Sequence, residues 1–564
     1  MPQKHPNQYS DGLARSPNTN AINWSSAPPK GHEETTMPTT LPRTSYDWAL
    51  KHLLLEGDTD LLPPLPELDA IRFSWPQLAP LFVDLDVEQY RWKGERRFIV
   101  PKENLAFRSA TQLDPLDSLI FAAIVRKWGG RIERIRIPVD ENRVYSHRFA
   151  PTTDGRFYGE ASGWHEFWAR SIDLAHSCQA VLMADITDYY NQIYHHVLEN
   201  QLQASGLPSG IWKSIKRLIS HLTQSVSRGV PVGPHPVHLL AEVALNPIDR
   251  SMVAHGFEFC RFVDDIHVFC ASEQAAVTVA QDLATIIDNQ QRLTLQKQKT
   301  KIMSANQFIN YAQMMLKDRP IDDIESDILQ VIQTYSGDSP YDSIDIQKIS
   351  TAHLDVLRAE RLEPLLSKYL TAEHVEYGHV RWLLRRLSQL GAPGAIDFVL
   401  QHLNELAPAL GDVARYIMRA ARNYTGNWIS AGQRIVGVLE HPLVERSEYV
   451  RVILLHLFAR VPALDHVSKL TARYQSEGAP VRREILFAAR AAGDGAWLRE
   501  RKADLETADP WLRRAIVASA SAWPGDESEH WIKHVKSGLS LIEKLLLRWA
   551  FRDKHLNVGT IEIA

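Results

Sequence analysis

The chain has 564 residues, of which 45% are hydrophobic and 23% are charged, as in an ordinary globular protein. This length is too great for a single hydrophobic core, so we expect two or more domains. No apolar run is long enough to cross a bilayer, and the N-terminus, MPQKHPNQYS, lacks the apolar region of a secretory signal. We therefore expect neither a membrane protein nor a secreted one.

Cysteine usage and charge set two further limits. Cys178, Cys260 and Cys270 lack disulfide or zinc spacing, so we expect a reducing, cytoplasmic location. The net charge of −4 does not favour general binding of polyanions, although a nucleic-acid enzyme can concentrate positive charge locally. Two basic runs, 91–108 and 126–136, are candidates for this, but each alone is best interpreted as solvated surface.

In chain order, the first segment is predicted to be disordered. Residues 1–43 are rich in Pro, Ser, Thr and Asn and contain few apolar side chains. An amphipathic helix is predicted over 45–56 with Ser45 as its N-cap. The stretch 57–71 follows as a proline-rich connection. From about 95 to 320 short strand-like runs alternate with helical ones, which predicts an α+β region.

Within this region three strands and three helices are predicted. The strands are 96–100, 180–186 and 258–269, and the helices are 118–128, 238–256 and 273–290.

After about residue 325 the sequence changes to helix-length amphipathic segments separated by Gly, Pro or Asp. They are 379–391, 394–406, 412–424, 447–461, 480–493, 509–523 and 540–551. Short, regularly interrupted helices favour stacked helical pairs of the α-solenoid type. A compact helical bundle is the alternative.

Carboxylates carry the candidate chemistry. Asp185 ends one apolar strand, and Asp264 and Asp265 lie in the middle of another. If the two strands are neighbours, Asp185 and Asp264 share a site, where their charges repel and shift their pKa values. A divalent cation removes this cost, and hard oxygen ligands of this kind suit Mg²⁺.

Further pieces follow in a fixed order. The loop GVPVG at 229–233 leads directly into a helix, and its glycines allow the backbone to approach a ligand closely. After the Asp-Asp strand comes 293–302, where Lys299 could act as a general acid toward pyrophosphate. The stretch 307–316 is predicted as a short hairpin-like strand pair.

Taken together, these pieces resemble the palm of reverse transcriptases. Asp185 with Tyr190 resembles the first palm motif, GVPVG the second, and the four residues Phe262 to Asp265 the family's Y/F-x-D-D box. LTLQKQKT and FINY resemble the last two. Upstream, FIVPKENLAFR resembles the fingers segment and VYSHR a fingers-to-palm motif, so the resemblance covers about 45–320.

The resemblance implies roles for individual residues. The implied metal set for two Mg²⁺ ions, or Mn²⁺, is Asp185, Ile186, Asp264 and Asp265, and the implied catalytic residues are Asp185, Asp264, Asp265 and Lys299. The implied nucleotide-binding set is Lys102, Arg108, Tyr190, Val232 and Gly233. Lys102 and Arg108 would neutralise the triphosphate, and Tyr190 would be a steric gate that favours dNTP over NTP. Val232 departs from the Gln usual in the second motif.

Neighbouring side chains are interpreted as structural. Tyr189 is expected to pack in the interior, and Asp188 to be an N-cap or solvated. His195 and His196 are expected to lie on a helix surface or in the core and not to be ligands.

A subgroup is suggested by 48–71, which resembles the N-terminal segment of bacterial defence-associated reverse transcriptases of the abortive-infection and unknown-group types. Several of those have a helical-repeat C-terminal region. The implied fold is an α+β right-hand polymerase, with fingers and palm, followed by an all-α helical-repeat domain. The expected division is a disordered 1–43, an N-terminal and fingers region 44–180, a palm 181–322 and the helical domain 323–564.

The resemblance also implies a function in antiphage defence. The chain would synthesise DNA from dNTPs, either directed by RNA or without a template, with an RNA template or single-stranded DNA product as its nucleic-acid partner and homo-oligomers as a further candidate. Two alternatives remain. One is a catalytically quiet palm that serves as a binding scaffold, with the helical repeats as the partner surface. The other is an RNA polymerase, against which Tyr190 argues.

Overall fold

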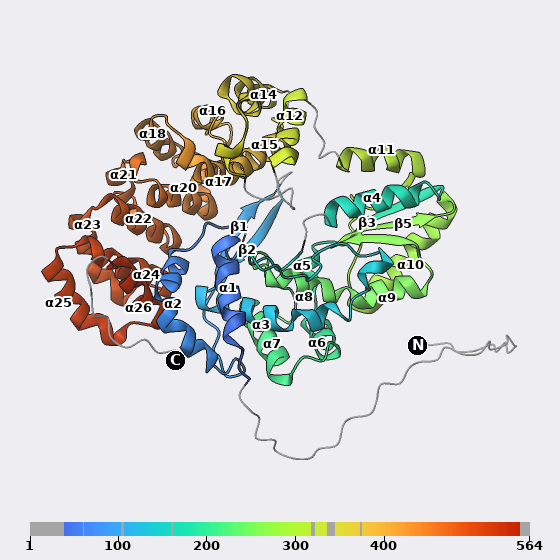
Figure 1. Cartoon of the computed structure of the whole chain (residues 1–564), viewed down its shortest axis with the longest axis horizontal. Helices are drawn as coiled ribbons and strands as arrows, with labels where there is room; N and C mark the ends of the chain where they lie inside the picture. Colours follow the sequence, from blue (N-terminus) through green and yellow to red (C-terminus); the bar gives the residue numbers. More distant parts are fainter. Residues whose placement is uncertain are drawn as a thin grey trace, which may run out of the picture. The chain divides into compact units, whose positions relative to one another are not determined.

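Most of the described part of the chain is helical, and it contains two small antiparallel sheets (Figure 1). The computed structural model describes residues 39–59, 61–102, 106–159, 163–316, 322–335, 344–372 and 375–552. The segment predicted to be disordered therefore lies outside the described residues except for its last few positions. No described helix is long and apolar enough to span a membrane.

Two helices open the described chain, α1 (Arg43–Leu55) and α2 (Pro66–Val83). Helix α1 begins after Pro42, so the prediction that Ser45 is its N-cap was wrong, and Ser45 lies buried in the first turn. The proline-rich connection ends at Leu65, earlier than predicted. Pro66 starts α2 because a proline at the first helical position gives up only an N–H that has no partner there anyway.

The region predicted to be the fingers contains a hairpin of β1 (Arg96–Pro101) and β2 (Phe107–Gln112), followed by α3 (Pro115–Glu133). The strand alternates, with Phe98 and Val100 buried against the C-terminal helices and Ile99 60% exposed on the opposite face.

A four-stranded sheet lies in the region predicted to be the palm, and we call it the palm sheet. Its strand order is β4-β5-β3-β6, with every pair antiparallel. Its strands are β3 (Ala180–Asp185), β4 (Phe259–Phe262), β5 (Asp265–Cys270) and β6 (Lys301–Ser304). The single strand predicted over 258–269 is thus wrong, because a two-residue turn at Val263 and Asp264 folds it into the β4–β5 hairpin.

Helices cover both faces of this sheet. Helix α10 (Glu273–Gln291) packs on one face, and α4 (Gly163–Ala175) and α11 (Ala305–Leu316) pack on the other (Figure 1). The strand pair predicted over 307–316 is wrong, since this stretch belongs to α11. Its buried residues Phe308, Ile309 and Ala312 follow helical spacing and pack between the sheet and α4.

Short helices connect the palm strands. They are α5 (Tyr189–Gln192), α6 (His195–Ala204), α7 (Ser209–Leu222), α8 (Pro236–Ala244) and α9 (Asn246–Ala254). The helix predicted over 238–256 is divided into α8 and α9. Pro247 lies in the first turn of α9, where a proline that cannot continue the preceding hydrogen-bond ladder is tolerated.

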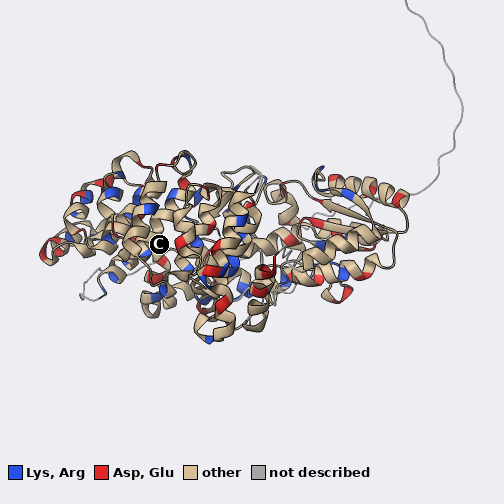
Figure 2. Cartoon of the chain, turned by 90° about the horizontal axis from the view of Figure 1, so that it is seen from above, with Lys and Arg blue, Asp and Glu red and all other residues tan. Residues whose placement is uncertain are grey.

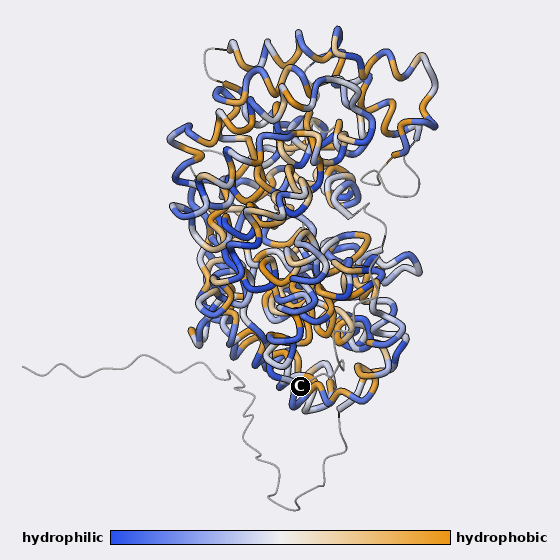
Figure 3. Tube along the Cα trace, turned by 90° about the vertical axis from the view of Figure 1, so that its left-hand side faces the viewer, coloured by the Kyte–Doolittle hydropathy of each residue, from blue (hydrophilic) through white to orange (hydrophobic). Residues whose placement is uncertain are grey.

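The C-terminal region is helical, as predicted. Its α-helices are α12 (Asp323–Tyr335), α13 (Thr351–Leu354), α14 (Ala359–Thr371), α15 (Tyr377–Leu390), α16 (Ile396–Gln401), α17 (Leu410–Ala420), α18 (Trp428–Val438), α19 (Pro442–Arg446), α20 (Glu448–Arg460), α21 (Val467–Thr471), α22 (Ala479–Ala492), α23 (Gly495–Glu500), α24 (Pro510–Ser519), α25 (Gly525–Val535) and α26 (Leu541–Ala550). Hydrophobic and hydrophilic positions alternate along the helical trace (Figure 3), and charges of both signs are interspersed over the chain (Figure 2).

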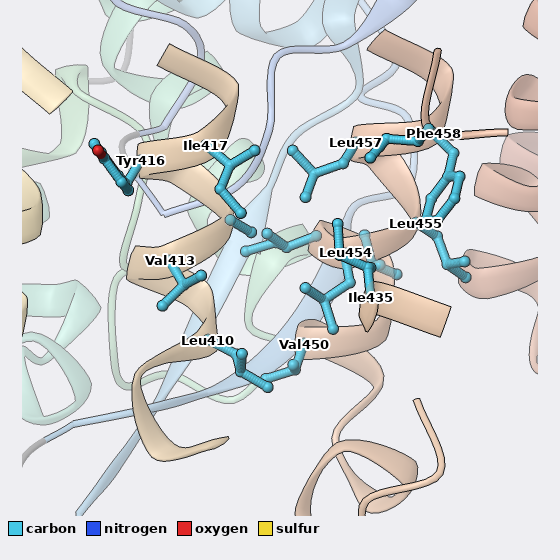
Figure 4. Packing of buried hydrophobic residues seen from close by; sticks show 14 of the residues in the cluster. Leu410, Val413, Tyr416, Ile417, Ile435, Val450, Leu454, Leu455, Leu457 and Phe458 are labelled. Atoms are coloured by element: carbon cyan, nitrogen blue, oxygen red, sulfur yellow. The ribbon is translucent and has the colours of Figure 1, made fainter. Parts of the chain in front are cut away.

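These helices pack in series, α15 on α17, α17 on α20, α20 on α22, α22 on α24 and α24 on α26. Figure 4 shows one such step, in which α17 and α20 interdigitate through Leu410, Val413, Ile417, Val450, Leu454 and Leu457. Serial packing is consistent with the stacked helical pairs that the sequence favours over a compact bundle.

The helical array is joined to the N-terminal region by polar contacts in a buried interface. Arg483 of α22 donates two hydrogen bonds of 2.7 Å to the Glu67 carboxylate of α2. Arg514 pairs with Asp114, and the Tyr449 hydroxyl donates to the Leu61 carbonyl at 3.0 Å. Helix α26 packs against α2, and α20 against β1, so the array supports the back of the fingers.

The Arg483–Glu67 pair gives a test of this interface. Arg483→Leu should lower the free energy of unfolding by about 3 kcal/mol, because it leaves the buried Glu67 without its closest cation. Urea denaturation followed by circular dichroism measures this change. Arg446→Leu, at an exposed position, is the matched control and should change stability by less than about 0.5 kcal/mol. Equal midpoints for the two variants would contradict the assignment.

Acid stability gives a second test. His267 of β5 is buried among Phe167, Trp168 and Phe308, and this burial lowers its pKa to about 3. In the unfolded chain the histidine pKa is about 6.5, so the unfolded state binds the proton first and stability falls as the pH drops from about 6.5 toward 3.

His267→Phe removes this proton uptake and keeps an aromatic side chain in place. Between pH 7 and pH 5 it should lose about 2 kcal/mol less stability than the unmodified chain, in urea titrations at each pH. His196→Phe, at an exposed position, should follow the unmodified chain. The same pH dependence for His267→Phe and the unmodified chain would show that His267 is not held neutral.

Candidate active site

Three carboxylates meet at one end of the palm sheet. Asp185 is the last residue of β3 and Asp265 the first of β5, and the two are direct partners in the antiparallel register. Asp264 lies in the adjoining turn, and its carbonyl accepts a hydrogen bond of 3.2 Å from the Ile186 amide. The structure therefore brings together the four residues that the family resemblance implies as a metal set.

The electrostatics of this end reflect crowded negative charge. Burial, aided by the neighbouring carboxylates, raises the pKa of Asp265 to about 7 and that of Asp264 to about 6. Lys299 lies beside Asp185, with its Nζ 2.9 and 3.1 Å from the two carboxylate oxygens. Partial burial opposes the charge of Lys299, but the hydrogen bond to Asp185 and the three carboxylates raise its pKa.

A divalent cation fits the chemistry of this donor set. The described residues contain no preformed group of three or more metal-ligating side chains, and Asp185 is paired with Lys299. Mg²⁺, however, usually takes only one or two protein carboxylates and completes its shell with phosphate and water. Asp185 and Asp264 could supply these carboxylates, and Ile186, whose side chain is buried and apolar, could contribute only through its backbone.

The turn that carries Asp264 has a strained backbone, which hydrogen bonds with Ser146 and Arg261 stabilise. Val263 has a φ of 53°, which is rare for a β-branched residue. Its amide donates to the Ser146 Oγ at 2.9 Å, and its carbonyl accepts from the Arg261 guanidinium at 2.9 Å. Ser146 in turn donates to Glu242 at 2.5 Å. These contacts fix a conformation that the free peptide would rarely adopt.

Glu242 is the centre of a buried ionic network. It accepts hydrogen bonds from Arg261 at 3.0 Å and from Arg136 at 2.8 Å, and Arg261 also binds both oxygens of Asp249. Burial disfavours the charge of Glu242, but the two guanidinium groups outweigh it and hold its pKa below its usual value. The sequence reasoning missed this network, although a glutamate inside an apolar helix is a signal.

The burial of Arg136 differs from what the sequence suggested. The run 126–136 was best interpreted as solvated surface, yet Arg136 is only 3% exposed. Its guanidinium binds Glu242 and the carbonyls of Ser146 and His147. It is therefore a structural support of the site.

Tyr190, the predicted gate, lies on α5 just beyond the carboxylates, and its hydroxyl is 2.7 Å from Nδ1 of His238. Tyr189 is buried, and its hydroxyl donates to the Ala241 carbonyl, so the prediction that it packs in the interior is confirmed. Asp188 occupies the N-cap position of α5, as expected, although its side chain accepts from Asn191 and makes no capping hydrogen bond.

The GVPVG loop joins the palm to the fingers. The Val232 carbonyl accepts a hydrogen bond of 2.8 Å from the Thr111 amide of β2. Gly233 has a φ of 132°, and a Cβ there would lie 2.7 Å from the Thr111 carbonyl, so only glycine fits. His195, buried and predicted not to be a ligand, is 2.8 Å from the Gly229 carbonyl through its Nε2. Val232 and Gly233, the two loop residues predicted to bind the nucleotide, thus each have a structural role in this contact with β2.

Lys102 and Arg108 flank the tip of the fingers hairpin, whose residues 103–105 lie outside the described part. Lys102 is exposed, and its charge acts on Asp264, whose pKa it tends to lower. Arg108 faces Val100 across the hairpin, and among the described residues no group accepts a hydrogen bond from its Nε. The structure thus brings Lys102 within electrostatic range of the carboxylates, whereas Arg108 makes no contact with them in the described residues.

Comparisons with known proteins show what the chain and its candidate site are similar to. Among solved structures, the chain resembles telomerase from Candida albicans, in complex with a fragment of telomeric RNA, at 11% sequence identity and a TM-score of 0.27. The match covers 70% of this chain and 65% of that chain, and likeness at this level supports no inference about this chain. The comparison with curated proteins gives no match. Residues 134–325, which carry all three carboxylates, match the family model of reverse transcriptase (RNA-dependent DNA polymerase).

Proposed function

We propose that the chain is a DNA polymerase that joins dNTPs to a 3′-hydroxyl end and releases pyrophosphate. The observation that carries this proposal is the convergence of Asp185, Asp264 and Asp265 at one end of the palm sheet, inside the segment that matches the reverse transcriptase model. Carboxylates whose pKa values are raised by burial and by their mutual repulsion are a site prepared for cations.

Each residue has a definite part in this reaction. Asp185 and Asp264 would hold divalent cations, with Asp265 as an auxiliary charge. Bound in pairs, such ions stabilise the attacking and leaving oxygens of an in-line displacement. Lys299 would give a proton to the leaving pyrophosphate. A cation held by Asp185 would take the place of Lys299 beside that carboxylate and so make Lys299 available for this role.

Substrate selection would come from both the fingers and the palm. Lys102 and Arg108 would neutralise the triphosphate, and the ring of Tyr190 would crowd a 2′-hydroxyl and so favour dNTP over NTP. Synthesis would follow an RNA template or proceed without one, giving single-stranded DNA. A role in antiphage defence is supported by the resemblance of 48–71 to defence-associated reverse transcriptases and by the C-terminal helical region.

Nucleotide incorporation tests the proposal directly. Purified full chain with Mg²⁺ and labelled dNTPs, with and without added RNA, should form product that Asp264→Asn reduces by at least about 100-fold, because the neutral amide is a poor ligand for the cation. Omitting the metal should abolish product in the same assay. Asp288→Asn, on an exposed part of α10, is the matched control and should retain activity.

Equal product from the unmodified chain and Asp264→Asn would remove the polymerase assignment. Binding of nucleic acid with no incorporation under any condition would instead support the alternative, a catalytically quiet palm that acts as a scaffold. Product that remains attached to the protein after denaturation would point to priming by a side chain.

Lys299 gives a second prediction. Lys299→Met should lower kcat by roughly 100-fold, as expected for loss of a general acid. Lys299→Arg keeps the positive charge beside Asp185 but is a poor proton donor, so it should also be slow. Single-turnover incorporation rates for the three proteins check this. Full activity of Lys299→Arg would show that Lys299 acts only through its charge.

A further inference from the structure

Two stacked histidines lie directly behind Tyr190. The rings of His238 and His147 are parallel within 7° with their centroids 4.3 Å apart, and His238 is the hydrogen-bond partner of the Tyr190 hydroxyl. Tyr158 packs edge-on against both imidazoles. We call His147 and His238 the histidine pair. The family resemblance assigns no role to either residue.

The histidine pair is itself firmly held. His147 has a φ of 43°. The Arg136 guanidinium donates a hydrogen bond of 2.9 Å to the His147 carbonyl and one of 2.8 Å to the Ser146 carbonyl. The backbone that carries His147 therefore belongs to the same network that supports the turn of Asp264. A stacked partner on a fixed backbone leaves His238 little freedom to rotate.

Helix α8 connects the gate and the carboxylates. His238 and Glu242 lie four residues apart, hence on the same face of the helix. His238 reaches Tyr190, and Glu242 holds Ser146 and Arg261, which fix the turn of Asp264. One rigid element thus sets the position of the gate relative to the proposed metal site.

We propose that His238 is a positioning residue that fixes the ring of Tyr190 through its hydrogen bond and thereby sets the discrimination between dNTP and NTP. The inference rests on the proposed function, because sugar selection has meaning only in a polymerase. A ring held at its hydroxyl end cannot swing away from an incoming 2′-hydroxyl, whereas the same ring without that bond can rotate and admit it.

The protonation of His238 agrees with this role. Burial, together with the nearby His147 and His235, holds the pKa of His238 well below its usual value. The imidazole is therefore neutral at physiological pH. In the tautomer that carries its proton on Nε2, Nδ1 accepts the hydrogen bond from the Tyr190 hydroxyl.

The test compares kcat/KM for a dNTP and the matching NTP in the full chain. Tyr190→Phe and His238→Phe each remove the hydrogen bond and keep an aromatic ring. Each should lower the dNTP preference by roughly 5- to 10-fold, the size expected for one neutral hydrogen bond. The double variant should show no further loss, because both changes remove the same interaction.

Three further variants complete the design. Tyr190→Ala removes the ring and should give the largest loss of preference. His238→Asn places an amide oxygen near the position of Nδ1, so it should keep most of the dNTP preference that His238→Phe loses. His196→Phe, on the exposed face of α6, is the control and should leave the preference unchanged. General misfolding would lower both kcat/KM values together and would not change their ratio.

Each outcome decides the inference. Suppose that the unmodified chain prefers dNTP, that Tyr190→Ala loses this preference, and that the single variants Tyr190→Phe and His238→Phe both keep it. The ring of Tyr190 then acts without the histidine, and the inference is overturned while the polymerase assignment stands. If His238→Phe does not fold, Tyr190→Phe tests the same bond from its other end. If the unmodified chain incorporates no nucleotide at all, the polymerase proposal and this inference fail together.

Discussion

Negative charge gathered at one end of the palm sheet is the constraint on which the rest of the site depends. The antiparallel register places Asp185 opposite Asp265, and the turn adds Asp264, so three carboxylates share one partly buried end. Such a group is costly unless cations lie nearby. Lys299 supplies one positive charge within the chain itself, and burial together with the neighbouring carboxylates still raises the pKa values of Asp264 and Asp265.

A second layer of charge below the carboxylates has the opposite character. There Glu242 and Asp249 are matched by Arg261 and Arg136 in a buried network that continues to Glu133 and Arg148. Because these ions compensate one another, the layer is rigid and can hold the strained turn at Val263. The site therefore joins a reactive surface whose charges are unbalanced to a support whose charges are balanced.

The same support extends to the fingers and the helical array. Ser146 and His147 belong to the predicted N-terminal and fingers region and meet α8, while the GVPVG loop hydrogen-bonds β2. Behind β1 lies α20, and Arg483 anchors α22 to α2. The carboxylate end of the sheet is thus connected through packed elements to the helices that follow it in the chain.

The sequence by itself determined the composition of the candidate site: the order of Asp185, the GVPVG loop and the Asp-Asp pair, the strand ending at Asp185, and the helical character after residue 325. It failed where local pattern is ambiguous. Residues 307–316 form α11 and 258–269 form a hairpin, since short apolar runs suit either a strand or a helix until their neighbours are known. Only the tertiary structure decided the partners of Arg136, Glu242 and His238. Each is defined by contacts between residues far apart in the chain, and no local periodicity encodes such contacts.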